Sequence, residues 1–160
     1  MQNIYIAAVG KLKEKYLRDA FAEYEKRLSA FCRFRVIEID EERLPDKPSE
    51  AEIKNGIEKE ADRILKKIPE NRFLVSLCVE GGQMSSEEFA DTVKKSAVDG
   101  FSNLVFVIGG SFGLSDRIKK QSQKRLSFSK MTFPHQLFRV MLSEQIYRAE
   151  QIINGGKYHK

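Results

Sequence analysis

Residues 126–136 hold the side chains whose types and spacing say most about chemistry. This stretch, Leu-Ser-Phe-Ser-Lys-Met-Thr-Phe-Pro-His-Gln, packs apolar residues, three hydroxyls and a lysine into a short segment. Pro134 sets φ near the helical value where a missing N–H does no harm, so a helix should start there. Phe133 precedes the proline and is pushed toward an extended conformation. We therefore expect a strand end, a tight loop and a long helix, with backbone N–H groups free to meet a ligand.

A second segment of interest is Gly109-Gly-Ser-Phe-Gly-Leu-Ser115, which follows the apolar run 104–108. It lacks the Gly-Lys-Ser/Thr ending of a P-loop and does not match G-x-G-x-x-G, which disfavours a nucleoside triphosphate site. Two interpretations remain open. The segment is a plain glycine-rich turn between a strand and a helix, or its backbone closely approaches an adenosine-like ligand that carries no phosphate.

Other reactive side chains are few and scattered. Cys32 and Cys78 lack metal-ligand spacing, and we expect buried thiols in a reducing compartment rather than a disulfide. The two histidines, His135 and His159, are too few for a histidine metal cluster. The N-terminus lacks the layout of a signal peptide, and no apolar run is long enough to span a membrane. The sequence therefore predicts a cytoplasmic protein without a metal and without a membrane segment.

The formal net charge of +5 and the pI of about 9.2 are compatible with an anionic partner such as RNA. The charge is modest, however, and a basic surface kept for solubility explains it equally well. No aromatic-basic signature of the common RNA-binding modules is present.

The elements that would position these residues alternate along the chain. Apolar runs indicate strands, and apolar residues at steps of three and four indicate helices between them. Ser49 and Ser85 begin capping boxes, and Ser115 is a candidate N-cap. This alternation predicts a single α/β domain over residues 1–160 with a largely parallel sheet. Ligands bind such sheets at the carboxyl ends of the strands, where three segments are expected to form one pocket: 77–82, 109–113 and 128–133. The strands are expected at 3–10, 34–39, 72–79, 104–108 and 125–128.

The long helix expected from residue 134 to 153 is apolar around more than half of its circumference. A helix that covers one face of a sheet needs a narrower stripe, so the surplus should meet a second surface. Self-association into a homodimer is the simplest way to provide that surface. The alternative is an unusually thick core within one chain. Glu144 and Arg148, four residues apart, can pair along this helix.

With these segments in place, the chain resembles the SPOUT class of ribosomal RNA large-subunit methyltransferases, which methylate N3 of a pseudouridine in 23S rRNA. The resemblance spans the whole chain, and it is most specific in residues 126–136 and 144–149. After Gly-Gly-Ser the family often has Asn where this chain has Phe112, which affects the shape of that loop. The resembling segments are Ala7–Lys13, Phe106–Ser111, Leu126–Gln136, Glu144–Ala149 and Tyr158-His159.

The resemblance implies a deep trefoil knot near the C-terminus and a homodimer with the active site at the subunit interface. It also implies that S-adenosylmethionine (AdoMet) binds among the knot loops. The chemistry agrees, because adenine and a sulfonium need apolar walls and backbone hydrogen bonds rather than a metal or a strong nucleophile. Carried over by position, the implied cofactor contacts are Leu77, Gly109, Phe128, Ser129, Lys130, Met131, Thr132 and Phe133.

The C-terminal residues Tyr158 and His159 are the implied catalytic pair. A terminal tetrapeptide is usually frayed, so the residues alone would not assign them a role. By resemblance, His159 positions the base or removes its proton, Tyr158 stacks on or hydrogen-bonds the target nucleoside, and the tail completes the neighbouring subunit's site. RNA-facing or interface roles are also considered for Lys11–Lys15, Arg125, Arg139 and Arg148.

Two other functions remain as alternatives. One is a non-catalytic RNA-binding module of the same fold that associates with the ribosome. The other is a nucleotide-binding regulator that uses the loop 109–113.

Overall fold

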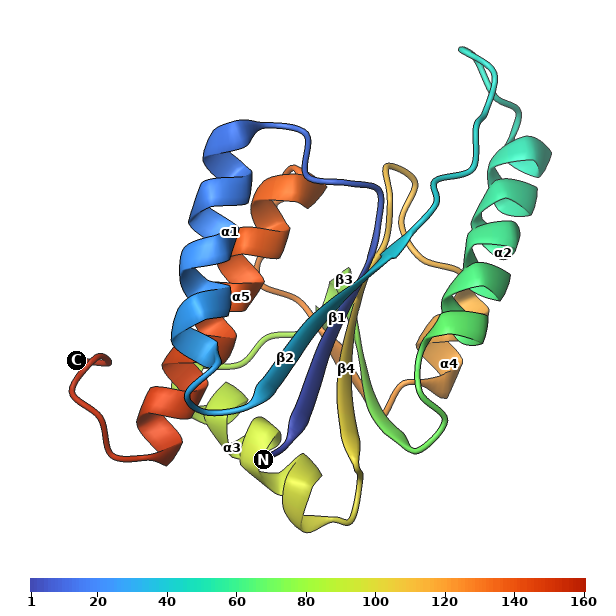
Figure 1. The fold of residues 1–160 in the computed structure, drawn as a ribbon. Helices are drawn as coiled ribbons and strands as arrows, with labels where there is room; N and C mark the ends of the chain where they lie inside the picture. The colour runs from blue at the N-terminus through green and yellow to red at the C-terminus, as the bar shows by residue number, and fades with distance from the viewer.

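Alternating apolar runs and amphipathic stretches fold into a five-stranded sheet with helices on both faces (Figure 1). The computed structural model describes residues 1–160. The strands are β1 (Asn3–Val9), β2 (Arg33–Ile39), β3 (Arg72–Gly82), β4 (Asn103–Ile108) and β5 (Lys124–Leu126). The helices are α1 (Lys15–Leu28), α2 (Glu50–Lys67), α3 (Ser86–Val98), α4 (Asp116–Gln121) and α5 (His135–Ile153).

The sheet has the strand order β2-β1-β4-β3-β5, and all four pairings are parallel. The expected α/β fold with a largely parallel sheet is therefore confirmed. In the inner strand β4 every residue after Asn103 is buried, as a strand covered by helices on both faces requires. The two edges differ in length, because β2 runs over seven residues and β5 over three.

Two helical layers cover the sheet (Figure 1). Helix α5 packs against both α1 and α3 on one face, and α2 and α4 lie on the other. Buried side chains form one apolar cluster under each layer, around Phe106 on the first face and Val107 on the second. The period-two alternation of a strand sends neighbouring residues to opposite clusters.

The helix starts follow the capping chemistry read from the sequence. Ser49 accepts a hydrogen bond from Glu52 N–H while Glu52 accepts one from Ser49 N–H, and Ser85 and Glu88 repeat the pattern. Ser115 accepts from Arg117 N–H at the start of α4. Each such cap contributes about 1 kcal/mol of stability. All three predicted caps are confirmed.

The apolar surface of helix α5 is broad because the helix has three neighbours within the chain: α1, α3 and the sheet. It lies on the sheet between α1 and α3, so Leu142, Ile146 and Ala149 are buried on more than one side. The alternative of a thick core within one chain therefore accounts for much of the apolar surplus. Leu137 and Met131, in contrast, remain 40% and 74% exposed beside the start of the helix.

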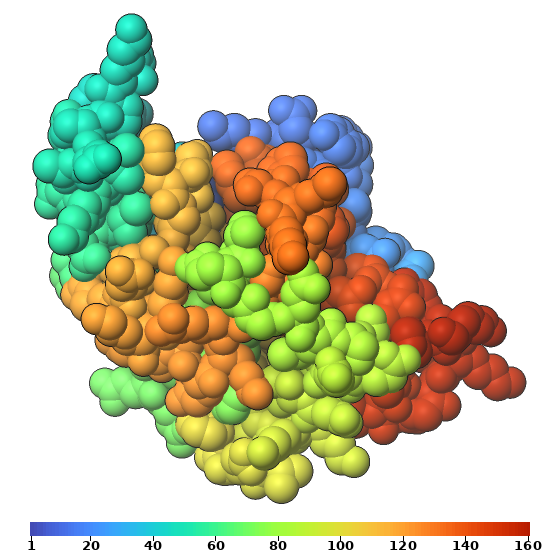
Figure 2. All heavy atoms as spheres, turned by 180° about the vertical axis from the view of Figure 1, so that it is seen from behind, coloured from blue at the N-terminus to red at the C-terminus, as the bar shows by residue number.

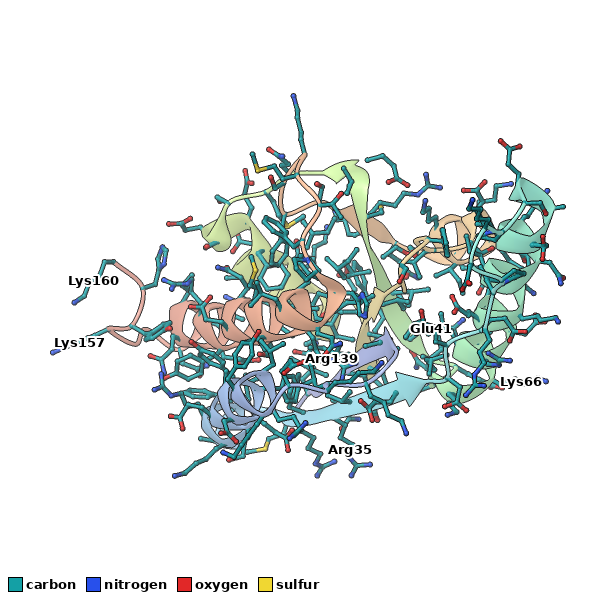
Figure 3. All side chains as sticks on the ribbon, turned by 90° about the horizontal axis from the view of Figure 1, so that it is seen from above. Arg35, Glu41, Lys66, Arg139, Lys157 and Lys160 are labelled. Carbon is teal, nitrogen blue, oxygen red and sulfur yellow. The ribbon has the colours of Figure 1, made fainter.

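Arg139 corrects one expectation. The sequence allows an RNA-facing or interface role for it, but Arg139 is only 2% exposed, on the buried side of α5 (Figure 3). Its guanidinium pairs with Glu38 at 2.9 Å and donates to the carbonyl of Gly10 at 3.0 Å. Arg139 therefore ties α5 to the ends of β1 and β2, and it is not available to RNA in this arrangement.

Two further expectations concern the cysteines and the membrane. Both cysteines are free thiols; Cys32 is buried and Cys78 is half-buried. Among the helices, none combines the length and the apolar character that a bilayer crossing would need.

Candidate functional site

A cavity of about 360 Å³ opens at the carboxyl ends of β3, β4 and β5. Its walls come from residues 77–80, 108–114, 126–129 and 131–133, together with His135 and Phe138 of α5 and Lys119 of α4. Figure 2 shows these segments meeting on one face, with the end of β3 in green, the loop after β4 in gold and the segment before α5 in orange. The expectation that three strand ends form a single pocket is confirmed.

The segment between β5 and α5 is shaped by hydrogen bonds of its own hydroxyls. Ser127 N–H donates to the carbonyl of Gly82, and its hydroxyl donates to the carbonyl of Ser129 at 2.9 Å. The hydroxyl of Ser129 accepts from Met131 N–H at 3.0 Å. The other backbone N–H groups of 128–133 donate no hydrogen bond within the chain. They are the free donors expected from the sequence.

Aromatic packing fixes the same segment against α5. The ring of Phe138 meets the ring of Phe128 edge-on, with centroids 4.7 Å apart, and it stacks on Phe133 at 6.2 Å. Such pairs contribute about 1 kcal/mol each beyond simple burial. The first turn of the helix therefore holds both ends of the loop 128–133, and it presents their rings to the cavity.

The loop after β4 turns so sharply that it needs glycine. A Cβ on Gly109 would lie 2.6 Å from the carbonyl oxygen of Gly113, and Gly113 itself has φ +85°. The close approach is thus between two parts of the loop. The segment is a glycine-rich turn between a strand and a helix, and because it also forms a wall of the cavity, it is compatible with both interpretations drawn from the sequence.

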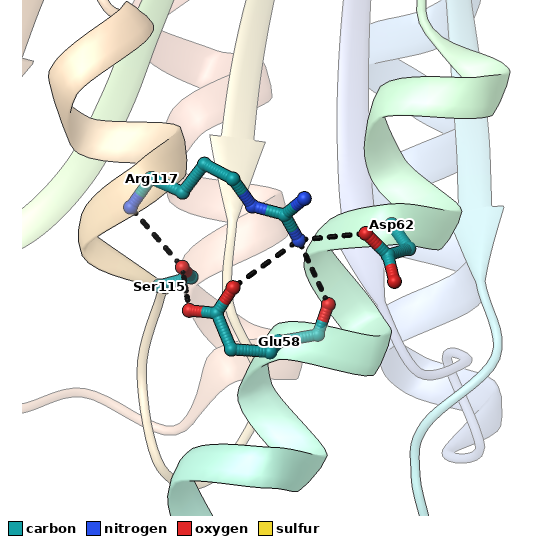
Figure 4. Close-up of polar contacts among 4 residues, drawn as sticks. All are labelled: Glu58, Asp62, Ser115 and Arg117. Atoms are coloured by element: carbon teal, nitrogen blue, oxygen red, sulfur yellow. Dashed lines mark hydrogen bonds and ion pairs between the residues drawn. The ribbon is translucent and has the colours of Figure 1, made fainter.

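Helix α2 braces the far end of this loop (Figure 4). The Ser115 hydroxyl donates to the Glu58 carboxylate, which also pairs with Arg117 at 3.2 Å. Arg117 further reaches Asp62 at 2.7 Å and the backbone carbonyl of Glu58 at 3.1 Å. These contacts fasten the start of α4, and with it the end of the loop 109–114, to a helix on the face of the sheet opposite α5.

Lys119 and Glu80 form an ion pair at the rim of the cavity. The Lys119 ammonium lowers the pKa of the Glu80 carboxyl, chiefly through their hydrogen bond. Burial raises the pKa of the Cys78 thiol nearby, so this thiol is a poor nucleophile at neutral pH. No three His, Cys, Asp or Glu side chains come together in a way that would hold a metal ion. The cavity offers apolar walls and hydrogen-bond donors.

Seven of the eight residues expected to contact a cofactor line this cavity: Leu77, Gly109, Phe128, Ser129, Met131, Thr132 and Phe133. Lys130 does not, because its side chain is exposed at the surface of the loop. Four apolar residues that the sequence did not identify as cofactor contacts also line the cavity: Ile108, Leu114, Leu126 and Phe138. Each sits in an apolar pattern that predicts core, and the sequence carries no signal for which apolar residue faces a cavity.

The C-terminal tail lies outside the cavity and folds back on α5. The Tyr158 hydroxyl donates to Glu144 at 2.9 Å, and its ring meets the ring of Tyr147 edge-on. Burial, together with the hydrogen bond to Glu144, raises the pKa of Tyr158 to about 12. The expected pair of Glu144 and Arg148 is present at 2.6 Å.

His159 is held between two charged side chains. Its Nδ1 lies 3.1 Å from Arg148, and its Nε2 lies 2.8 Å from Glu87 on α3. A guanidinium only donates, so Nδ1 must accept and Nε2 must carry the proton that it donates to Glu87. The hydrogen bond from His159 lowers the pKa of Glu87. In this position neither ring nitrogen is free to accept another proton.

Comparison with known proteins identifies the class to which this fold and site belong. The family model described as "Predicted SPOUT methyltransferase" matches residues 2–159. The chain belongs to the SPOUT methyltransferase family.

Several relatives match this chain over nearly the full length of both proteins. The chain is 52% identical over 158 residues to "Ribosomal RNA large subunit methyltransferase H" of Clostridium tetani, covering 99% of both chains. It is 53% identical over 158 residues to the protein of the same name in Clostridium kluyveri, again over 99% of both. The Streptococcus uberis protein of that name is 49% identical over 157 residues, which are 98% of this chain and 99% of the relative.

Solved structures share the fold at low sequence identity. A probable methylase family protein from Haemophilus influenzae superimposes with a TM-score of 0.54 at 12% identity, covering 99% of this chain and 71% of the other. A probable methyltransferase from Bordetella pertussis gives 0.56 at 10% identity, covering 93% and 95%. These two similarities concern the fold alone.

Proposed function

We propose that this protein is an AdoMet-dependent methyltransferase that methylates N3 of a pseudouridine in 23S rRNA, on the large subunit or the assembled ribosome. The observation that carries the proposal is the identity of about half the residues, over the full length, to relatives named ribosomal RNA large subunit methyltransferase H. The pseudouridine N3 target rests on the resemblance of residues 126–136, 144–149 and Tyr158-His159 to the family.

The cavity suits AdoMet in size and chemistry. A volume of about 360 Å³ is in the range of small-molecule sites, which are mostly apolar with a few placed polar groups. Leu77, Phe128 and Phe133 would wall the adenine, while the free N–H groups of 128–133 would donate to its ring nitrogens and to the carboxylate. Gly109 would bring the loop backbone close to the ligand. When bound, this cofactor supplies an electrophilic methyl group.

The protein's own part is to hold the base and manage its proton. Methyl transfer is an in-line displacement, so most of the acceleration should come from holding N3 in line with the methyl group. N3 must also lose its proton, and His159 is the candidate acceptor. Because Arg148 and Glu87 occupy both its ring nitrogens here, His159 would have to leave this position to act as a base. Otherwise it serves, with Tyr158, to position the nucleoside.

A homodimer and a trefoil knot complete the proposal. The tail does not line its own cavity, which supports a role in the site of a second subunit. Leu137 and Met131, exposed beside the cavity, are apolar residues that a partner subunit would cover. Ser127, at the start of the segment 127–133, donates its N–H to Gly82 at the end of β3, and the chain then returns to the face of α1 and α3, a course compatible with a knot.

Titration calorimetry with AdoMet, and with ATP as the comparison ligand, tests the cofactor. AdoMet should bind with a 1:1 stoichiometry per chain and ATP should give no heat. Binding of ATP instead would favour the nucleotide-binding regulator. A protein that binds AdoMet but never transfers its methyl group to ribosomes would be the non-catalytic RNA-binding module.

A further inference from the structure

The positive charge of this protein is concentrated in one segment. Residues 111–134 contain six of its 28 lysines and arginines but only one of its 23 acidic residues, so they carry a formal charge of +5. The rest of the chain is balanced, with 22 charges of each sign. The entire net charge therefore belongs to the segment that runs from the loop after β4 to the start of α5.

Two of the six cations are neutralised locally. Arg117 pairs with Glu58 and Asp62, and Lys119 pairs with Glu80. The other four are exposed and have no carboxylate within ion-pair distance. We call these four the cation strip: Lys120, Lys124, Arg125 and Lys130.

The cation strip borders the cavity. Lys124 and Arg125 lie on the edge strand β5, directly before Leu126, which lines the cavity. Lys130 stands in the loop whose neighbours on both sides are cavity walls, and Lys120 is on α4 next to the rim residue Lys119. In Figure 2 the gold and orange segments that carry these residues extend over one face from α4 to the loop before α5.

We propose that the cation strip, Lys120, Lys124, Arg125 and Lys130, binds the phosphate backbone of the rRNA next to the target base; this inference rests on the proposed function. Arg125 Nε donates to the carbonyl of Lys119 at 3.3 Å, a bond that does not use its charge against any carboxylate, and the charges of the other three cations likewise meet no carboxylate in the fold. Next to a site that must admit one base of a long polyanion, they attract its phosphates and fix its register without reading sequence.

The competing explanation is that cations on an edge strand only prevent edge-to-edge association. The opposite edge of the sheet offers a matched comparison, because β2 also carries two exposed arginines without carboxylate partners, Arg33 and Arg35. Figure 3 shows Arg35 projecting into solvent from that edge. β2 is separated from β5 by three strands, so it lies far from the cavity in the order of the sheet.

The test compares two double variants at constant change in charge, Lys124→Gln/Arg125→Gln and Arg33→Gln/Arg35→Gln, with purified ribosomes as substrate. The KM for ribosomes is measured at several salt concentrations, and the Kd for AdoMet is measured by calorimetry. The β5 variant should raise KM about tenfold and reduce the slope of log KM against log salt by about 2, since each lost phosphate contact removes about one unit. The β2 variant should behave as the wild type, and AdoMet affinity should not change in either.

Equal KM and equal salt slope in the β5 variant and the wild type would overturn the inference while leaving the proposed function intact. Equal losses in both double variants would also overturn it, because the effect would then follow net charge alone. A wild-type protein that neither methylates nor binds ribosomes would overturn the inference together with the proposed function.

Discussion

The loop after β4 can keep its shape only if residue 109 has no Cβ. Substitution Gly109→Ala would place a methyl carbon 2.6 Å from the Gly113 carbonyl oxygen, so the loop must open and change a wall of the cavity. We expect the affinity for AdoMet to fall by at least about tenfold, equivalent to about 1.4 kcal/mol. Calorimetry on the variant measures this loss.

Gly82→Ala is the matched control for this loop. A Cβ on Gly82 meets no atom closer than 3.9 Å, although the residue lies at the same edge of the sheet. Unchanged AdoMet affinity in this control, with a loss in Gly109→Ala, supports the loop as a wall of the cofactor site. Wild-type affinity in Gly109→Ala would contradict it.

Loss of Tyr158 and His159 should affect methylation and not the affinity for AdoMet. Neither residue lines its own chain's cavity, so removing Tyr158–Lys160 should leave the affinity for AdoMet within about threefold, a change of less than 1 kcal/mol. Methylation should nevertheless be lost, because the deleted residues are proposed to hold the target base. A Lys160→Ala variant controls for the terminal charge, and unchanged turnover after the deletion would refute the role of the tail.

Cys32 makes stability depend on alkaline pH. Burial raises its thiol pKa from 9.0 to about 12, so the folded protein keeps a proton that the unfolded chain releases. The free energy of unfolding should therefore fall as the pH rises from about 9 toward 12. Denaturant unfolding of the wild type and of Cys32→Ala checks this at several pH values. The variant should be less stable at neutral pH but lose less between pH 9 and 11, and parallel curves would argue against the linkage.

Among the elements, α2 acts on the site without touching the cavity. Glu58→Gln weakens the contacts that hold Ser115 and Arg117, so the end of the loop 109–114 should become more mobile. We expect a several-fold weaker affinity for AdoMet with a change of at most about 1 kcal/mol in the free energy of unfolding, as for a partly exposed pair. Gln121→Ala loosens α4 at its other end, where Gln121 binds Arg72, and it should leave the affinity unchanged. A similar loss of affinity in both variants would mean that α4 as a whole, and not the loop, is being disturbed.

Much of the fold could be predicted from local patterns, because capping boxes and apolar runs report directly on helix starts and buried strands. Ser49, Ser85 and Ser115 begin helices as expected, and β4 is buried in every residue after Asn103. The strand order could not be predicted, since the placement of β4 between β1 and β3 depends on contacts between residues far apart in the chain. The last strand also ends at Leu126, two residues early, because Ser127 N–H bonds to Gly82 beyond a break in the pairing of β3 with β5.

The candidate site was predictable in outline and not in detail. Three strand ends converge because parallel strands bring their carboxyl ends to one edge, which requires only the strand assignments. Whether a side chain lines the cavity depends on tertiary packing. Phe138 lines it from α5, while Lys130 is exposed in a loop whose neighbouring residues form a wall. The environment of Arg139 could not be predicted for the same reason, since nothing in the neighbouring sequence reveals that Glu38 lies beside it in space.

For the whole molecule, the position of the tail and the exposed Leu137 and Met131 predict a homodimer. Analytical ultracentrifugation at micromolar concentration should give a mass of about twice the chain's 18.4 kDa, as expected for a two-fold symmetric pair. A monomer under these conditions would remove the second subunit from the proposed site, and His159 would then have to reach the cavity of its own chain.

Binding of AdoMet in the cavity at the strand ends and transfer of its methyl group to ribosomal RNA can be tested in a single reaction. The most direct measurement is to incubate the protein with labelled AdoMet and ribosomes that lack the modification, and then to locate the label by mass spectrometry of RNA fragments. We expect one methyl group per ribosome, on N3 of a pseudouridine in 23S rRNA. Label absent from the rRNA, in a reaction where AdoMet binding has been verified, would contradict it.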